Sequence, residues 1–306
     1  MPSIRIATRQ SRLALWQAEH VVGLLRTAHA DLDVTLVPMT TQGDRILDRA
    51  LSDVGGKGLF IKELELAMAE NRADIAVHSM KDVPSELPDG MCLAAMLPRA
   101  DPRDAFVSTR FDSFDGLPQG ARVGTSSLRR QSQLLANRPD LELITLRGNV
   151  DTRLRKLDEG QYDAIILAAA GLLRLGLEQR IAHYIDVERS VPAVGQGIIG
   201  IECRSADAHT IERVAVLNDA QAWKCCEAER SFAERLQGSC QSPIGGFADI
   251  RDGQLQLRGV IASPDGREVY RGNNAGSPLD AKNLGRALAE RLLAAGAAAL
   301  LERLRE

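Results

Sequence analysis

The stretch SIRIATRQSRLALWQAEHVVGLLRTA, residues 3–28, decides the fold class. Its first residues, Ser3–Thr8, are typical of a strand, and Ser11 then precedes a helix that runs to about Ala28. The apolar residues that recur at helical spacing are Leu13, Trp16, Val21, Leu24 and Leu25. A strand that leads directly into a helix is the repeating unit of α/β proteins.

The same alternation of strand and helix continues along the chain. The sequence predicts strands at Asp33–Met39 and Asp74–His78 and a helix over Gly58–Glu70. The pattern restarts near Arg122, where the predicted elements are a strand ending at Arg122–Gly124, a helix from Ser126 or Ser127 to about Asn137, a strand at Leu141–Leu146, a helix marked by Val150, Leu154 and Leu157, and a strand at Asp163–Ala168. Such alternation implies mostly parallel sheets with helices on both faces. We therefore expect two α/β lobes, joined near Pro98–Arg103 and Val191–Gln196.

The sequence changes character after about Asp219. A helix is predicted over Ala220–Leu236, and a long Ala/Leu-rich helix over Pro278–Arg305. Between them lie three predicted strands, Phe247–Ile250, Gln254–Ile261 and Glu268–Arg271, with turns at Asp252-Gly253 and Pro264-Asp265-Gly266. We expect residues 1–98 with about 196–217 to form the first lobe, residues 103–192 the second, and residues 219–306 a small α+β domain with an antiparallel sheet.

Composition limits the classes of function. The chain of 306 residues is long enough for two or three domains. A net charge of −3 and an aromatic content of 4% argue against nucleic acid as a partner. No signal peptide precedes Thr8, and no apolar run approaches the length of a membrane span. The five cysteines are odd in number and form no C-x-x-C, which disfavours disulfides and zinc and favours a reducing cytosol.

Arginines gather at three predicted strand–helix turns. The clusters are Arg9, Ser11 and Arg12; Thr125, Ser126, Ser127, Arg129 and Arg130; and Arg147, Arg153 and Arg155. The first two lie in stretches that resemble each other, IATRQSRLALWQ (6–17) and VGTSSLRRQSQL (123–134). Helix N-termini and arginines both bind anions, and open α/β sheets bind ligands at this end of their strands. The P-loop motif G-x-x-x-x-G-K-[ST] is absent from the sequence, so a ligand rich in carboxylates fits at least as well as a phosphate.

Three further stretches could carry chemistry. In HSMKDVP (78–84), Asp82 could bind a ligand N–H or stabilise a developing cation, or only cap a loop, and His78 is more plausible as a packed histidine than as a base. Cys240 lies in a loop shaped by glycines and a proline, where a thiol is either a nucleophile or inert. The polar segment Arg45–Lys57 fits a mobile lid or a plain surface loop.

Taken together, these stretches resemble the hydroxymethylbilane synthase (porphobilinogen deaminase) family. The matching strings are RIATRQS (5–11), GGKGLFIKELE (55–65), ADIAVHSMKDVP (73–84), DPRDAFVS (101–108), VGTSSLRRQ (123–131), LRGNVDTRL (146–154), DAIILAAAGL (163–172), PAVGQGIIGIECR (192–204) and GSCQSPIG (238–245). The resemblance implies two lobes like those of periplasmic solute-binding proteins and a third domain that carries a cofactor. It implies that four porphobilinogen molecules are condensed head to tail, with loss of ammonia, on a covalent dipyrromethane.

The resemblance also implies a role for particular residues. Asp82 would be the catalytic carboxylate, which stabilises the azafulvene cation formed as ammonia leaves, and Cys240 would hold the cofactor through a thioether. Cofactor-binding residues would be Lys81, Thr125, Ser127, Arg129, Arg130, Arg147 and Gly148. Residues for the substrate and the growing chain would be Arg9, Ser11, Phe60, Arg153, Arg174 and Gln196, with Lys57 in the lid. No metal is expected, and we expect a cytoplasmic monomer.

Small departures from the family pattern affect loop details. The family often has Glu-Gly-Gly-Cys where this chain has Gln237-Gly238-Ser239-Cys240, and a proline is frequent at the position of Arg12. A non-catalytic two-lobe protein that binds a polycarboxylate solute or effector is the alternative function. Such a protein would need neither Cys240 nor Asp82 nor a third domain.

Overall fold

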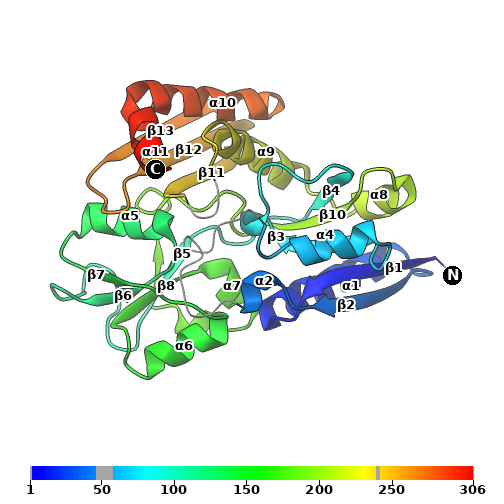
Figure 1. The fold of residues 1–306 in the computed structure, drawn as a ribbon, viewed down its shortest axis with the longest axis horizontal. Helices are drawn as coiled ribbons and strands as arrows, with labels where there is room; N and C mark the ends of the chain where they lie inside the picture. The colour runs from blue at the N-terminus through cyan, green and yellow to red at the C-terminus, as the bar shows by residue number, and fades with distance from the viewer. Residues whose placement is uncertain (1, 46–57, 239–241, 306) are drawn as a thin grey trace.

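Three separate sheets organise the computed structural model, which describes residues 2–45, 58–238 and 242–305 (Figure 1). Two sheets have five strands each, and the third has three antiparallel strands. The structure therefore confirms the expected fold class, two α/β lobes followed by a small antiparallel domain.

The first lobe is built on a sheet with the strand order β2-β1-β3-β10-β4. These strands are β1 (Ser3–Arg9), β2 (Asp33–Met39), β3 (Ile75–Ser79), β4 (Met91–Met96) and β10 (Ile199–Arg204). Strand β10 is antiparallel to both of its neighbours, so it alone runs against the others. The helices of this lobe are α1 (Arg12–Ala28), α2 (Gln42–Arg45), α4 (Lys62–Ala69) and α8 (Ala208–Ala215). Helix α1 buries Ala18, Val21 and Leu25 against Ile4 and Ile6 of β1.

The second lobe repeats this arrangement with the strand order β7-β6-β8-β5-β9. Its strands are β5 (Asp104–Val107), β6 (Arg122–Gly124), β7 (Glu142–Ile144), β8 (Ala164–Ala168) and β9 (His183–Ile185). Strand β5 is antiparallel to both neighbours and takes the place that β10 has in the first lobe. The helices are α5 (Leu128–Asn137), α6 (Val150–Asp158) and α7 (Ala169–Arg174), with a 3-10 turn at Glu178–Arg180.

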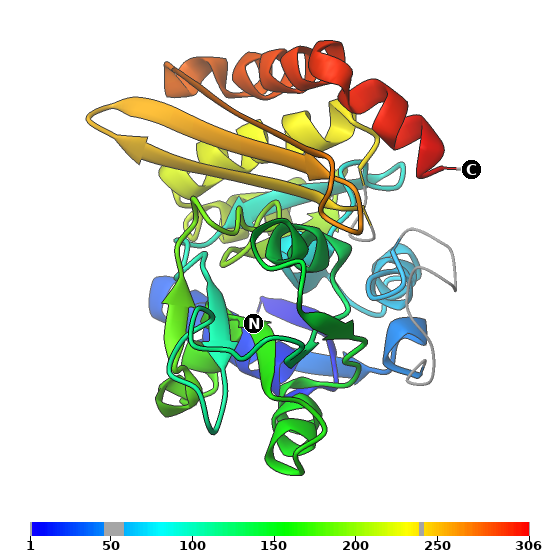
Figure 2. The same ribbon diagram turned by 90° about the vertical axis from the view of Figure 1, so that its left-hand side faces the viewer.

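The third sheet orders its strands β11-β12-β13, which are Ile244–Arg251, Gln254–Ala262 and Val269–Gly276. Asp252 and Gly253 both have positive φ and join β11 to β12 in the predicted two-residue turn. Helices α9 (Ala220–Arg235) and α10 (Ala281–Leu292) pack against each other and share one core with this sheet. Figure 2 shows this sheet above α5 of the second lobe, with which it is in contact.

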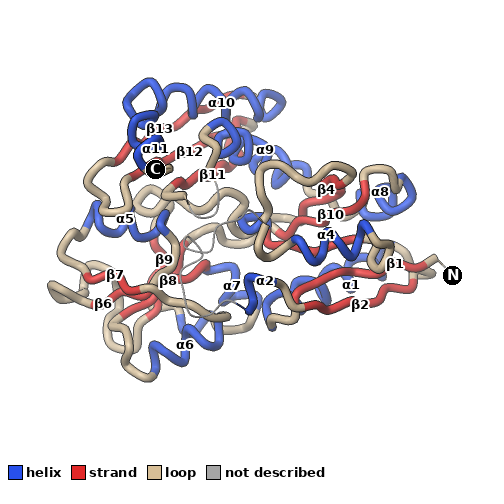
Figure 3. The backbone as a smooth tube through the Cα atoms, viewed as in Figure 1, coloured by secondary structure: helices blue, strands red, loops and turns tan. Residues whose placement is uncertain are grey.

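Two predicted helices differ from the structure. The predicted helix over Gly58–Glu70 begins only at Lys62, after a turn in which Gly58 has φ +77°. The predicted single helix over Pro278–Arg305 is a 3-10 turn at Pro278–Asp280, α10, a π-turn at Leu293–Ala297 and α11 (Ala298–Arg303). Gly296 has φ +120°, a conformation that breaks the helix and that only glycine adopts readily. Figure 3 shows the resulting change of direction between α10 and α11.

Candidate active-site cleft

A cleft of about 1650 Å³ lies where both lobes and the C-terminal domain meet. It is lined by nearly all of the described residues that the sequence analysis proposed for binding or catalysis: Arg9, Ser11, Phe60, Lys81, Asp82, Thr125, Ser127, Arg129, Arg130, Arg147, Gly148, Arg153 and Gln196. Arg174 lines a neighbouring pocket instead. Lys57, Cys240 and all of the expected lid after Arg45 lie outside the described residues.

Helix N-termini from both lobes border this cleft. Ser11 caps α1 by accepting a hydrogen bond from the backbone N–H of Ala14, and Ser127 caps α5 by accepting one from Arg130. Asn149 caps α6 in the same way. Each cap leaves other N–H groups of the first turn free of partners within the helix, and the positive end of the helix dipole adds to them. The turns therefore favour anions on both sides of the cleft.

Arg129 and Arg130 are buried and share one carboxylate, that of Asp104. Asp104 accepts hydrogen bonds from Nη1 and Nη2 of Arg129 at 2.9 and 3.1 Å and from Nε of Arg130 at 2.9 Å. Burial alone would raise the pKa of Asp104, but the charges of both arginines lower that pKa far below its usual range. Two cations facing one anion leave the cluster with a surplus positive charge. The sequence analysis missed Asp104, although it lies within the string DPRDAFVS and opens an apolar strand.

Arg9 at the end of β1 is held by a residue that the sequence analysis also missed. Its guanidinium forms a two-bond ion pair with Asp44 of α2, of which one bond, from Nε to Oδ2, measures 3.1 Å. Thr41 donates its hydroxyl to the same carboxylate at 2.7 Å, and the guanidinium stacks 4.3 Å from the ring centre of Phe60. Burial raises the pKa of Asp44, but the hydrogen bond and charge of Arg9 bring it below its usual value. A carboxylate ligand of Arg9 must therefore share the guanidinium with Asp44 or displace it.

Lys81 and Asp82 lie in a short 3-10 turn, Met80–Asp82, that follows β3. Burial lowers the pKa of Lys81 to about 8, and the charges of Arg130 and Arg153 add to this effect. Burial likewise lowers the pKa of Arg153 to about 10. The charge of Asp82 acts in the opposite direction on both groups. Asp82 is thus a carboxylate among crowded cations, and further anions bound here would relieve the repulsion between these cations.

The turn before α6 brings Arg147 and Arg153 to the same wall. Gly148 has φ +116°, and a Cβ there would lie 2.8 Å from Cβ of Thr152, so the turn requires glycine. Arg153 donates from Nε to the carbonyl of Gly148 at 2.8 Å, which orients its guanidinium. Burial lowers the pKa of Arg147, as it does for Arg153. Both arginines are therefore held in a desolvated wall, where a charged hydrogen bond is stronger than in water.

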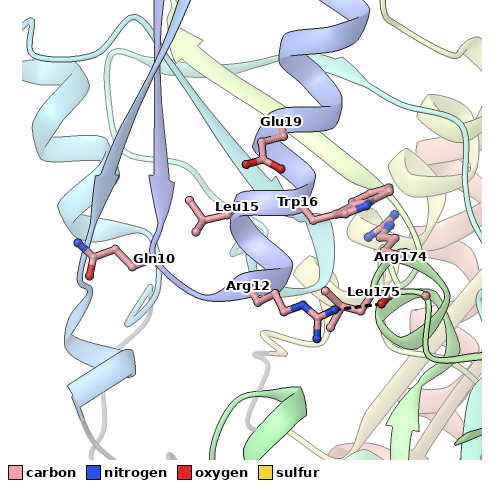
Figure 4. Close-up of a pocket in the computed structure, with 8 residues that line it drawn as sticks. Gln10, Arg12, Leu15, Trp16, Glu19, Arg174 and Leu175 are labelled. Atoms are coloured by element: carbon pink, nitrogen blue, oxygen red, sulfur yellow. Dashed lines mark hydrogen bonds between the residues drawn. The ribbon is translucent and has the colours of Figure 1, made fainter.

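Arg174 lines a second pocket of about 600 Å³ between α1 and the end of α7 (Figure 4). It donates to the carbonyl of Gly197 at 2.6 Å, and burial lowers its pKa to about 10. Arg12 bridges the two lobes there, since it donates to the carbonyl of Leu175 and pairs with Asp151 of α6 at 3.0 Å. The residues Gln10, Arg12 and Leu175 line both hollows, so this pocket adjoins the main cleft.

Gln196 lies on the second segment of chain that crosses between the lobes. Its side chain is hydrogen-bonded within the protein rather than free to bind a ligand. It donates from Nε2 to the carbonyl of Pro102 at 2.6 Å and to Asp104 at 3.1 Å. His78 is buried in the protein, as the sequence analysis predicted, and its Nε2 lies 2.8 Å from the fully buried Glu202. His78 is therefore not positioned as a free base.

The described cysteines are free thiols. Burial raises the pKa of Cys203, Cys225 and Cys226 to about 12 each, which keeps them protonated and unreactive at neutral pH. No cluster of histidine, cysteine or acidic side chains within residues 2–45, 58–238 and 242–305 could hold a metal ion. Over the same ranges, no helix is long and apolar enough to cross a membrane.

Comparison with known families gives two matches that follow each other along the chain. Residues 4–212 match the family described as porphobilinogen deaminase, dipyromethane cofactor binding domain. Residues 223–294 match the family described as porphobilinogen deaminase, C-terminal domain. The two matches together span most of the chain.

Several solved structures of low sequence identity align with most of this chain. The VFT2 domain of Bordetella pertussis BvgS is 15% identical, with 70% of this chain and 85% of that domain covered and a TM-score of 0.43. The methionine-binding protein MetQ is also 15% identical, with coverage of 72% and 90% and a TM-score of 0.45. A YaeC-family lipoprotein from Enterococcus faecalis is 13% identical, with coverage of 78% and 98% and a TM-score of 0.42.

Proposed function

The chain belongs to the porphobilinogen deaminase family, and from this premise we propose which of its residues carry out the reaction. The family's enzymes are transferases of tetrapyrrole biosynthesis. They condense four porphobilinogen molecules head to tail into hydroxymethylbilane and release ammonia, on a dipyrromethane cofactor. The match to a cofactor-binding domain and to the C-terminal domain of this enzyme favours catalysis over the alternative of a non-catalytic polycarboxylate-binding protein.

The cleft's cations fit a dipyrromethane, which carries an acetate and a propionate on each of its two rings. The supporting observation is the burial of several cations together: burial lowers the pKa of Lys81, Arg147 and Arg153, and neighbouring arginines lower the pKa of Lys81 and Arg153 further. Bound carboxylates would offset that unfavourable burial. We assign the cofactor's carboxylates to Lys81, Arg129, Arg130 and Arg147 and to the N–H groups and hydroxyls of Thr125, Ser127 and Gly148. When bound, the cofactor supplies the pyrrole carbon to which the first substrate is joined.

Asp82 is the proposed catalytic residue. As ammonia leaves a porphobilinogen, positive charge develops on its pyrrole ring, and a fixed carboxylate beside the ring stabilises that charge. The position of Asp82 supports this role, because it lines the cleft and its charge acts on both Lys81 and Arg153. This arrangement is the single observation on which the assignment depends.

The substrate and the growing chain also bring carboxylates, one acetate and one propionate for each pyrrole. We assign these carboxylates to Arg9, Ser11, Arg153 and Arg174. Phe60 and Gln196 complete the proposed substrate site without binding a carboxylate: Phe60 stacks on Arg9, and Gln196 is bonded to Pro102 and Asp104. Arg9, stacked on Phe60, stands on the first lobe, and Arg153 on the second, so a ligand between them would contact both lobes. Arg174 extends this group toward the adjoining pocket. Lys57, outside the described residues, is proposed to act in a lid over the cleft.

Cys240 is proposed as the residue that bonds the cofactor, although it lies outside the described residues. The neighbouring residues Gln237, Gly238, Ser242 and Pro243 all line the cleft, so the loop that carries Cys240 begins and ends there. We further propose that residues 1–98 with about 196–217, residues 103–192 and residues 219–306 are the three domains. The enzyme is proposed to work as a monomer in the cytoplasm.

The intact mass of the purified protein tests the attachment directly. Wild-type protein should be heavier than its sequence by one dipyrromethane. The variant Cys240→Ser should lack both this adduct and the formation of hydroxymethylbilane from porphobilinogen, whereas Cys92→Ser should keep both. An adduct of unchanged mass on Cys240→Ser would place the cofactor on another residue.

A further inference from the structure

One face of helix α9 in the C-terminal domain is docked on the segment that follows Asp82. Residues four positions apart lie on the same side of a helix, and Ala222, Cys226 and Arg230 have this spacing. Ala222 and Cys226 are buried in one small core with Met80 and Val83, the residues on either side of Lys81 and Asp82. The same face of the helix therefore meets the catalytic turn of the first lobe.

Arg230 adds polar contacts to this apolar docking. It donates from Nη1 to the carbonyl of Val83 at 3.2 Å and from Nη2 to the carbonyls of Pro84 and Ser85 at 2.7 and 2.8 Å. Burial lowers the pKa of Arg230, which shows that the guanidinium is desolvated at this contact. A planar guanidinium is suited to bind several acceptors at fixed directions, which a lysine cannot do.

We propose that Arg230 is a positioning residue that fixes Asp82 relative to the helix leading to the cofactor-bearing loop. This inference rests on the proposed role of Asp82. Three successive carbonyls, beginning one residue after Asp82, are bound by one side chain of another domain. The carboxylate of Asp82 is thereby oriented from the C-terminal domain and not only from the strand β3 that precedes it.

Helix α9 also connects this contact to the site of cofactor attachment. It ends at Arg235 with Leu236 as its C-cap, and Gly238, two residues later, lines the cleft. Leu236 is six residues beyond Arg230, which corresponds to about 9 Å along a helix. A rigid helix of this length holds the catalytic carboxylate and the start of the cofactor-bearing loop at fixed positions relative to each other.

A displaced Asp82 should affect the transition state more than the binding of substrate. Porphobilinogen is held mainly by its carboxylates, whereas Asp82 acts on charge that develops during the reaction. We therefore expect the variant Arg230→Gln, compared per cofactor-loaded molecule, to lose roughly 10- to 100-fold in kcat with KM little changed, since small misplacements of this kind cost up to about 100-fold. Arg230→Lys keeps the charge but not the planar guanidinium that binds several carbonyls, and it should retain an intermediate kcat.

Arg204 provides a matched control for a purely structural effect. It is also a partly buried arginine that donates to two backbone carbonyls of the first lobe, those of Met68 and Ala73, each at 2.8 Å. Arg204→Gln should lower the thermal midpoint at least as much as Arg230→Gln, yet leave kcat and KM per loaded molecule near the wild-type values.

The experiment compares steady-state kinetics of these variants with Asp82→Asn, after cofactor loading has been measured by intact mass. A reduced kcat in Arg230→Gln with unchanged KM, partial recovery in Arg230→Lys and normal kinetics in Arg204→Gln support the inference. Wild-type kcat in loaded Arg230→Gln, while Asp82→Asn is impaired, overturns the inference alone. An equal loss of kcat in Arg204→Gln also overturns it. Wild-type turnover by loaded Asp82→Asn overturns the proposed function, and the inference with it.

Discussion

Replacing Asp104 with asparagine should be among the most destabilising single changes near the cleft. Asp104 is fully buried and accepts six contacts of 2.8 to 3.1 Å, from Arg129, Arg130, Ser190 and Gln196. Asparagine has the same shape but only one acceptor oxygen. In one orientation its amide nitrogen would face the donors of Arg129 and Ser190. In the other it would face the donors of Arg129, Arg130 and Gln196. Two buried guanidinium groups would then have no carboxylate partner in this cluster.

The expected loss of stability follows from the buried charges of Arg129 and Arg130, which asparagine would no longer neutralise. Removing one partner of a buried ion pair costs about 3–5 kcal/mol, because the remaining charge stays desolvated. If the two lobes unfold together as a unit of roughly 200 residues, each kcal/mol corresponds to about 2–4 °C of Tm, and the thermal midpoint should fall by roughly 6–20 °C. The loss of stability caused by Asp104→Asn should also depend on pH. Because the pKa of Asp104 is depressed in the folded protein, its contribution is fully present above its usual pKa of 3.8 and declines as the pH falls below that value.

Thermal unfolding of Asp104→Asn and of a surface control measures this cost. Asp115→Asn is the control, since it also breaks a two-bond pair with an arginine, Arg189, but one at the surface. That change should cost at most about 1 kcal/mol. Acidification below about pH 3.8 should narrow the difference between wild type and Asp104→Asn, because the unfolded wild type then binds a proton at Asp104 that the folded protein does not. Equal midpoints for the two variants at pH 7 would refute the idea that Asp104 compensates a buried cation pair.

Two further predictions concern the chemistry of the cleft. In cofactor-loaded enzyme, Asp82→Asn should reduce kcat by on the order of 10²–10³, and Asp82→Glu, which keeps the charge, should retain more activity; equal turnover by the two variants would rule out charge as the cause. Asp44→Asn should lower KM for porphobilinogen roughly two- to fivefold, because the change removes the carboxylate that competes with the substrate for Arg9. The ion pair between Asp44 and Arg9 is worth about 0.5–1 kcal/mol. An increased KM would instead mean that Asp44 orients Arg9 for its ligand.

Local signals in the sequence predicted local features of the structure well. The strand Asp33–Met39 and the turn at Asp252-Gly253 have the predicted bounds, and the strand Arg122–Gly124 ends where predicted. Alternation, caps and turn residues act over a few positions, which makes such features predictable. The final helix was predicted wrongly as continuous. Nothing in its Ala/Leu-rich pattern marks the break except Gly296, and a glycine inside a helix does not by itself require one.

The partners of the cleft arginines could not be predicted from the sequence. Asp104 is 25 and 26 positions from Arg129 and Arg130, and Asp44 is 35 positions from Arg9. Such contacts depend on how whole strands and helices pack, and no spacing rule specifies them. The sequence therefore predicted where anions would be attracted, but not that acidic side chains of the protein itself already occupy some of the arginines.

The similarity between residues 6–17 and 123–134 has its explanation in the repeated lobe architecture. β1 with α1 and β6 with α5 hold the same places in two sheets of the same strand order, and each pair presents a capped helix N-terminus to the cleft. Each lobe also supplies a carboxylate for its arginines, but the two differ in burial: the side chain of Asp104 is 0% exposed and that of Asp44 is 22% exposed. A buried carboxylate with two arginines is not readily exchanged, whereas a partly exposed one can give way to a ligand's carboxylate. This difference suits the proposed roles of the two sites, in which Arg129 and Arg130 hold a permanent cofactor and Arg9 binds a new substrate in every cycle.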